Sequence, residues 1–169
     1  MFTYIILGII FIILFIIILL FILNNNKLKR LIIKIKEAEN NIDMILTEKY
    51  TILSKIDKSI KDKSNTDFFN GLYKTNIEDV DSFELNKILS KYDNAVIELS
   101  DYNKDLEYDD EDIADFERLN NINIDRLATE KFYNDNVVIY NKLIYKFPIN
   151  IISKFKKYNK KELFSNEKE

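Results

Sequence analysis

The chain begins with an apolar segment that carries no charged side chain. From Phe2 to Leu23 it reads FTYIILGIIFIILFIIILLFIL, and the first charged side chain is that of Lys27. A helix of this length rises about 33 Å, enough to cross the hydrocarbon core of a bilayer. Because it is apolar on every face, it does not fit the surface of a soluble protein. Residues 1–24 are therefore predicted to be a transmembrane anchor, with the lipid bilayer as the partner of residues 2–23.

A cleaved signal peptide is the main alternative for this segment. It would need a basic N-terminal region, a shorter apolar run and small residues at a cleavage site, whereas this chain starts MFTY and continues NNNK after the run. We therefore expect a retained, single-pass anchor in the cell membrane. Five basic residues follow the segment and none precedes it: Lys27, Lys29, Arg30, Lys34 and Lys36. The positive-inside rule then predicts an N-terminus outside and a cytoplasmic helical domain.

Three further helices are predicted from apolar positions that recur every three or four residues. The first, about 27–62, continues directly from the anchor, because the asparagines between them weaken a helix without ending it. The second is predicted at about 80–101 and the third at about 111–147, where Pro148 ends it. The expected inward residues are Leu28, Leu31, Ile32, Ile35, Ala38, Ile42, Ile45, Leu46, Ile52, Leu53, Ile56 and Ile60; then Phe83, Ile88, Leu89, Tyr92, Val96 and Leu99; then Ile113, Phe116, Leu127, Val137 and Ile144, flanked by Tyr133, Tyr140 and Phe147.

This pattern predicts an all-α protein: a transmembrane helix followed by an antiparallel three- to four-helix up-down bundle with long helices. The bundle is expected over residues 25–160 and a frayed tail over 161–169. With alternating helix directions, residues 101–112 would turn on the membrane side. The amphipathic piece after Pro148 would cap the distal end near Phe68 and Phe69; binding to anionic lipid is its alternative role. Its apolar residues are Ile149, Ile151, Ile152, Phe155 and Tyr158, set against five lysines.

The composition argues against several classes of function. The 25 basic and 28 acidic residues give a net charge of −3, which does not favour nucleic-acid binding. Histidine and cysteine are absent, so the chain lacks the commonest general base, zinc ligand and thiol nucleophile. Two glycines, Gly8 and Gly71, cannot build a phosphate-binding loop. We expect no catalytic residues, cofactor, resident metal or small-molecule substrate.

The segment FYNDNVVIYNKLIYKFP, residues 132–148, repeats a Tyr-Asn pair at a seven-residue interval and ends in Phe-Pro. This pattern resembles the C-terminal signature of the LemA family. The stretches IDRLATEKFYND and KEAENNIDMIL, which begin at Ile124 and Lys36, are similar to two further parts of that family. The resemblance implies an N-terminal anchor with its short end outside, a helical bundle beyond it, and no established reaction.

The chain also departs from the family pattern in its first helix. Glu39 stands where the family usually has an aromatic residue, and Glu48 and Lys49 stand where it usually has two arginines. Residues 53–56 read Leu-Ser-Lys-Ile in place of Ile-Pro-Asn-Leu. Whatever those family residues do, the first helix of this chain is not expected to do it in the same way.

The signature residues are expected to be structural: Tyr133, Asn134, Tyr140, Asn141, Phe147 and Pro148. Asn134 and Asn141 fall near the inward stripe, where a buried asparagine fixes register and partner choice in helical bundles. A ligand-binding role is the alternative for them. The two tyrosines are expected at the edge of the core with their hydroxyls reaching out.

An acidic stretch, DYNKDLEYDDED, runs from Asp101 to Asp112. Six side chains fall at the ligand positions of a twelve-residue calcium loop: Asp101, Asn103, Asp105, Glu107, Asp109 and Asp112. However, Leu106 replaces the glycine of the sharp turn, and Asp112 replaces the bidentate glutamate. We expect these carboxylates to stabilise the start of the third helix instead.

The sequence as a whole predicts a membrane-anchored, non-enzymatic interaction or scaffold protein with a protein partner of unknown identity. The alternative is a carboxylate-dependent metal-binding or hydrolytic protein that uses the acidic corner at residues 101–112.

Overall fold

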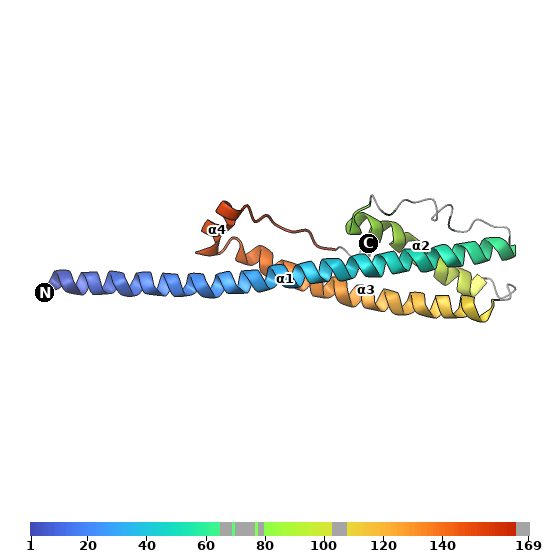
Figure 1. Ribbon diagram of the computed structural model, residues 1–169, viewed down its shortest axis with the longest axis horizontal. Coiled ribbons are helices and arrows are strands. Elements are labelled where there is room, and N and C mark those ends of the chain that lie inside the picture. The colour runs from blue at the N-terminus through green and yellow to red at the C-terminus, as the bar shows by residue number, and fades with distance from the viewer. Residues whose placement is uncertain (65–68, 70–76, 78–79, 103–107, 165–169) are drawn as a thin grey trace. The chain divides into compact units, whose positions relative to one another are not determined.

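A computed structural model describes residues 1–64, 69, 77, 80–102 and 108–164, and no strand occurs in these ranges. The described elements are α1 (Phe2–Ser64), α2 (Ser82–Tyr102), α3 (Asp110–Leu143) and α4 (Ile149–Lys156) (Figure 1). The all-α prediction is confirmed. Phe68, predicted near the distal cap, and the side chain of Leu99, predicted to point inward, lie outside the described part.

α1 is one continuous helix that joins the apolar segment to the heptad stripe, as predicted. Asn24 donates from its amide to the carbonyl of Leu20 at 2.8 Å, so this side chain bonds along the helix instead of competing with it. Most side chains of the apolar segment are exposed, with Ile17 and Phe21 partly covered, and α1 is the one described helix long and apolar enough to cross a membrane. Its first fully covered side chain is that of Leu28.

The chain forms two compact units, each with its own buried side chains. The terminal unit contains residues 1–37 and 132–169, and the central unit contains residues 38–131. Buried apolar residues of the terminal unit are Leu28, Leu31, Ile35, Tyr133, Val137, Tyr140, Leu143, Ile144, Ile149 and Phe164. Those of the central unit are Ala38, Ile42, Leu46, Ile52, Leu53, Ile56, Ile60, Phe69, Leu85, Leu89, Leu119 and Ile122.

Within the central unit, α2 runs in the same direction as α1. Ser82 at the start of α2 hydrogen-bonds to Asp43, and Asp93 farther along α2 pairs with Lys49. The seventeen residues 65–81 can extend more than about 50 Å, whereas returning from Ser64 to the level of Asp43 along a helix takes about 32 Å. The long connection therefore lets the chain return before α2 begins, and the alternating directions that we predicted for helices one and two are wrong.

The acidic corner consequently lies at the other end of the central unit from the one predicted. Asp112 accepts hydrogen bonds from Ser59 and Lys63, which lie in the last turns of α1. Lys63 is forty residues beyond Leu23 on the same helix. The predicted membrane-side turn is therefore wrong, because it assumed that α2 returns toward the anchor.

The piece after Pro148 is predicted to cap the bundle near Phe68 and Phe69. α4 belongs to the terminal unit with the anchor, whereas Phe69 belongs to the central unit and packs edge-on against Tyr92 at 5.4 Å. Ile149 is buried, but Phe155 is 84% exposed. The piece after Pro148 thus shares a unit with residues 1–37, beside which Figure 1 shows it.

α3 ends at Leu143, four residues earlier than predicted. The chain turns over residues 144–148, where the amide of Lys146 donates to the carbonyl of Leu143 at 3.0 Å. Pro148 cannot donate a backbone hydrogen bond and disfavours the α conformation at the residue before it, so α3 ends before the proline. Pro148 then forms the N-cap of α4, after a cis peptide bond from Phe147.

Candidate functional site

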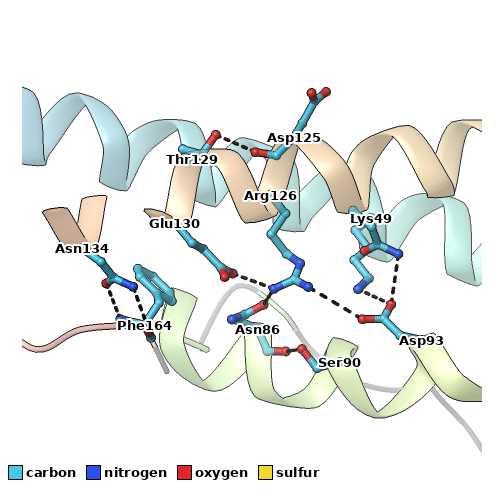
Figure 2. A network of polar contacts seen from close by, with 11 residues as sticks. Lys49, Asn86, Ser90, Asp93, Asp125, Arg126, Thr129, Glu130, Asn134 and Phe164 are labelled. Carbon is cyan, nitrogen blue, oxygen red and sulfur yellow. Dashed lines mark hydrogen bonds and ion pairs between the residues drawn. The ribbon is translucent and has the colours of Figure 1, made fainter. Parts of the chain in front are cut away.

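Two asparagines of α3 hold the backbone of the C-terminal segment, defined here as residues 159–164. Asn134 donates from Nδ2 to the carbonyl of Phe164 at 2.8 Å and accepts from the amide of Phe164 at 2.9 Å (Figure 2). Asn141 makes the same pair of bonds to Lys161, each at 2.9 Å. Each side-chain amide thus satisfies both backbone groups of one residue.

The tyrosine that precedes each asparagine adds a further bond to the same backbone. The hydroxyl of Tyr133 donates to the carbonyl of Glu162 at 3.1 Å, and that of Tyr140 donates to the carbonyl of Asn159 at 3.2 Å. The ring of Tyr133 also packs edge-on against that of Phe164 at 5.1 Å. We call Tyr133, Asn134, Tyr140 and Asn141 the Tyr-Asn clamp, since all six of these hydrogen bonds go to the backbone.

The two asparagines of the clamp are about as far apart along α3 as the two residues that they bind are along the extended segment. The seven residues from Asn134 to Asn141 rise about 10.5 Å, and the three residues from Lys161 to Phe164 extend about 10 Å. The tyrosines show the same spacing. Tyr133 and Tyr140 are seven residues apart on α3, and the residues that they bind, Glu162 and Asn159, are three apart on the segment. The heptad of Tyr-Asn pairs therefore fits a peptide that runs antiparallel to α3 with a three-residue repeat.

Three expectations about the signature residues and the tail are corrected. Lys161 and Phe164 are bound, and Phe164 is 5% exposed, so the predicted fraying does not begin at residue 161. Residues 165–169 lie outside the described part. Both tyrosine rings are buried, and burial raises the pKa of Tyr140 above its ordinary value. Phe147, expected beside the inward stripe, is exposed.

A buried ionic cluster occupies the middle of the central unit. Lys49 of α1 is fully buried, and its Nζ lies 2.5 Å from a carboxylate oxygen of Asp93 (Figure 2). Arg126 of α3 contacts Glu130 at 2.8 Å, Asn86 at 3.2 Å and the second oxygen of Asp93 at 3.9 Å. Two positive and two negative side chains therefore meet among three helices, and their charges cancel.

Burial dominates the electrostatics of this cluster. It lowers the pKa of Lys49, because a buried ammonium loses its hydration, and the Asp93 carboxylate opposes the effect only in part. Within the described residues, Arg126 Nε and Glu130 Oε2 are buried without a hydrogen-bond partner. Such groups cost free energy, so the cluster adds less stability than its number of ion pairs would suggest.

This cluster was not predicted from the sequence, although the heptad pattern contains a signal for it. Lys49 continues the series Leu28, Ile35, Ile42 and Ile56 and is the polar member of that series. Arg126 interrupts another series, in which Leu119, Tyr133 and Tyr140 are buried. The prediction of the inward face of α3 was therefore partly wrong. Ile113 and Leu127 are exposed, whereas the charged Arg126 and Glu130 are buried.

The carboxylates of the acidic corner cap α3. The amide of Asp112 donates to Asp109 at 2.9 Å, and the amide of Asp109 donates back to Asp112 at 3.2 Å. Burial raises the pKa of Asp112, but hydrogen bonds from Lys63, Ser59 and the Asp109 amide outweigh this and hold it below its ordinary value. These are the reciprocal bonds of an N-terminal capping box.

The remaining candidate calcium ligands, the side chain of Asp101 and residues 103–107, lie outside the described part. In the part that is described, no group of three or more acidic, histidine or cysteine side chains is placed to hold a metal ion. Comparison with protein-family models, curated proteins and solved structures finds no match to this chain.

Proposed function

We propose that this protein is a membrane-anchored, LemA-like interaction module without enzymatic activity. The observation that carries the proposal is the continuity of α1, whose exposed apolar segment passes without a break into the helix that supplies the buried face of both units. Exposed Ile, Leu and Phe side chains contribute about −0.3 to −0.6 kcal/mol each on insertion, which sums to a strongly favourable total.

The polar features support binding and architecture more than chemistry. The signature residues of α3 hold a peptide backbone, and the charged residues of the central unit hold each other. A hydrolytic role for the acidic corner is not proposed, because Asp109 and Asp112 are engaged in capping and in ion pairs with Lys63. We further propose that the N-terminus lies outside and the helical units lie in the cytoplasm, with another membrane or cytosolic protein as partner.

Cysteine labelling tests the anchor and its orientation, because the chain contains no cysteine. Met44→Cys places a thiol at a position that is 71% exposed on α1, and a second variant carries a cysteine added before Met1. We expect a membrane-impermeant maleimide to label the N-terminal cysteine in intact cells and Met44→Cys only after permeabilisation. The cysteine-free parent is the control.

The outcomes of this experiment separate the anchor from its direction. The reverse labelling pattern would contradict the proposed orientation and keep the anchor. Release of the full chain from membranes by alkaline carbonate would contradict the anchor itself.

A further inference from the structure

The feature that the proposed function leaves unexplained is the geometry of the Tyr-Asn clamp. A segment that only closed the core would need apolar side chains, and residues 159–164 bury one large apolar side chain, Phe164. Lys160, Glu162 and Leu163 are exposed. Recognition of this segment is therefore made through its backbone.

We propose that the Tyr-Asn face of α3 is a binding site for an extended peptide, and that residues 159–164 are its built-in, displaceable ligand. The site recognises the amide and carbonyl groups of two residues three apart, which the asparagines bind. It adds a site for one aromatic side chain against Tyr133, where Phe164 lies. Side chains between the anchors face solvent, so the site tolerates variation there.

The physical form of the segment supports this assignment. Residues 159–164 belong to no helix or strand, so their backbone groups are not used within such an element and can bond to the side chains of α3. A three-residue repeat is also the period of a polyproline II helix, which has no internal hydrogen bonds. A side-chain amide that pairs with both groups of one residue replaces the bonds that a neighbouring strand would make. The side chains of Asn134 and Asn141 thus bind an extended backbone as the edge strand of a sheet would.

Covalent connection keeps the segment in place. A tethered segment has an effective concentration near the millimolar range, so a free peptide competes only when the segment detaches. The segment therefore regulates access to the site. This inference gives the interaction module proposed above a specific peptide-binding surface and rests on that proposal for its biological meaning, while the binding itself is measured on purified protein.

A nicked form of the full chain tests the proposal. A protease site inserted between Tyr158 and Asn159 is cut in the purified, detergent-solubilised protein, which leaves residues 159–169 held without a covalent link. A fluorescent peptide of the same eleven residues is then added. We expect it to displace the original segment saturably in the nicked chain and much more slowly in the uncut chain.

Peptides with methylated backbone nitrogens identify the contacts while the protein stays unchanged. Methylation at Lys161 and Phe164 removes the two backbone N–H groups that donate hydrogen bonds to the asparagine side chains. We expect at least about tenfold weaker binding. Methylation at Leu163 is the matched control, because its amide makes no hydrogen bond to the described residues. We expect this control to change binding less than about threefold.

Three results would overturn the proposal. The first is a folded nicked chain, judged by circular dichroism, that does not bind the labelled peptide. The second is an original segment that a large excess of peptide cannot displace. The third is an equal loss of binding for all methylated peptides. None of them affects the labelling experiment on the anchor, so the failure of one proposal can be told from the failure of the other.

Discussion

At the scale of single residues, Lys49 shows how one charged side chain depends on its partners. It lies on the apolar face of α1, is fully buried, and has Asp93 as its nearest opposite charge. Arg126 and Glu130 form a second pair beside it. Removing one charge leaves the others unbalanced, whereas removing a matched pair does not.

Lys49→Met is therefore expected to destabilise the protein. The loss from a fully buried pair is about 3–5 kcal/mol, but Asp93 is 23% exposed, so we expect about 2–3 kcal/mol. Lys49→Met combined with Asp93→Leu removes a neutral pair and should recover stability to within about 1 kcal/mol of the parent. Urea unfolding followed by circular dichroism measures both.

Lys58→Met, at an exposed position on the same helix, is the control and should change stability by less than about 0.5 kcal/mol. A double variant that is less stable than the single one would show that Asp93 matters to the fold independently of Lys49.

Lys49→Met should also change how the free energy of unfolding depends on pH. Because the pKa of Lys49 is lowered in the folded state, the unfolded chain binds this proton more tightly between the lowered value and about 10.5. The contribution of Lys49 to stability therefore rises with pH in that window. Lys49→Met should remove this rise, which unfolding curves on the alkaline side of neutrality will show.

At the scale of elements, the apolar spacing predicted which helices form but not how they are arranged. The stripe of α1 was predicted almost in full, because its apolar residues recur without a competing series. The stripe of α3 was predicted less well, because its inward positions include Arg126 and Glu130, which pattern reasoning places on the surface. Burial of charge depends on partners from other helices, and periodicity does not contain that information.

The clamp could be predicted only as a motif. The heptad of Tyr-Asn pairs put Asn134 and Asn141 on one face of α3, but their partner is an irregular segment that is largely polar. Nothing in the pattern of that segment marks it as bound, because the bonds go to its backbone. The direction of α2 was missed for a similar reason, since residues 65–81 carry no periodic signal that shows how far the chain returns.

α4 carries an apolar surface that the terminal unit does not cover, and we expect it to contact the bilayer. Phe155 is 84% exposed and Ile151 is 49% exposed, beside Lys154 and Lys156. Phe155→Trp adds a single tryptophan, because the chain has none. In nanodiscs that contain anionic lipid, we expect its emission to shift to the blue and to be quenched by brominated acyl chains.

Met44→Trp is the matched control, since Met44 is exposed on α1 in the central unit. It should show neither the shift nor the quenching. Equal quenching of both tryptophans, or of neither, would mean that α4 has no specific contact with lipid.

At the scale of the whole molecule, the anchor and the two units share a helix but not a hydrophobic core. The apolar segment contributes no fully buried side chain, and complete burial on α1 begins at Leu28. Deleting residues 1–23 should therefore leave both sets of buried residues intact. We expect the shortened chain to be water-soluble and helical, with a thermal midpoint within about 4 °C of the full chain in detergent, since a change below 1 kcal/mol shifts the midpoint by no more than a few degrees. The Lys161 and Phe164 amides should keep their protection from hydrogen exchange, because the clamp that holds them lies entirely beyond the deletion. Aggregation or loss of helix in the shortened chain would instead mean that the apolar segment packs against protein, in the same chain or in another copy, and that lipid is not its principal environment.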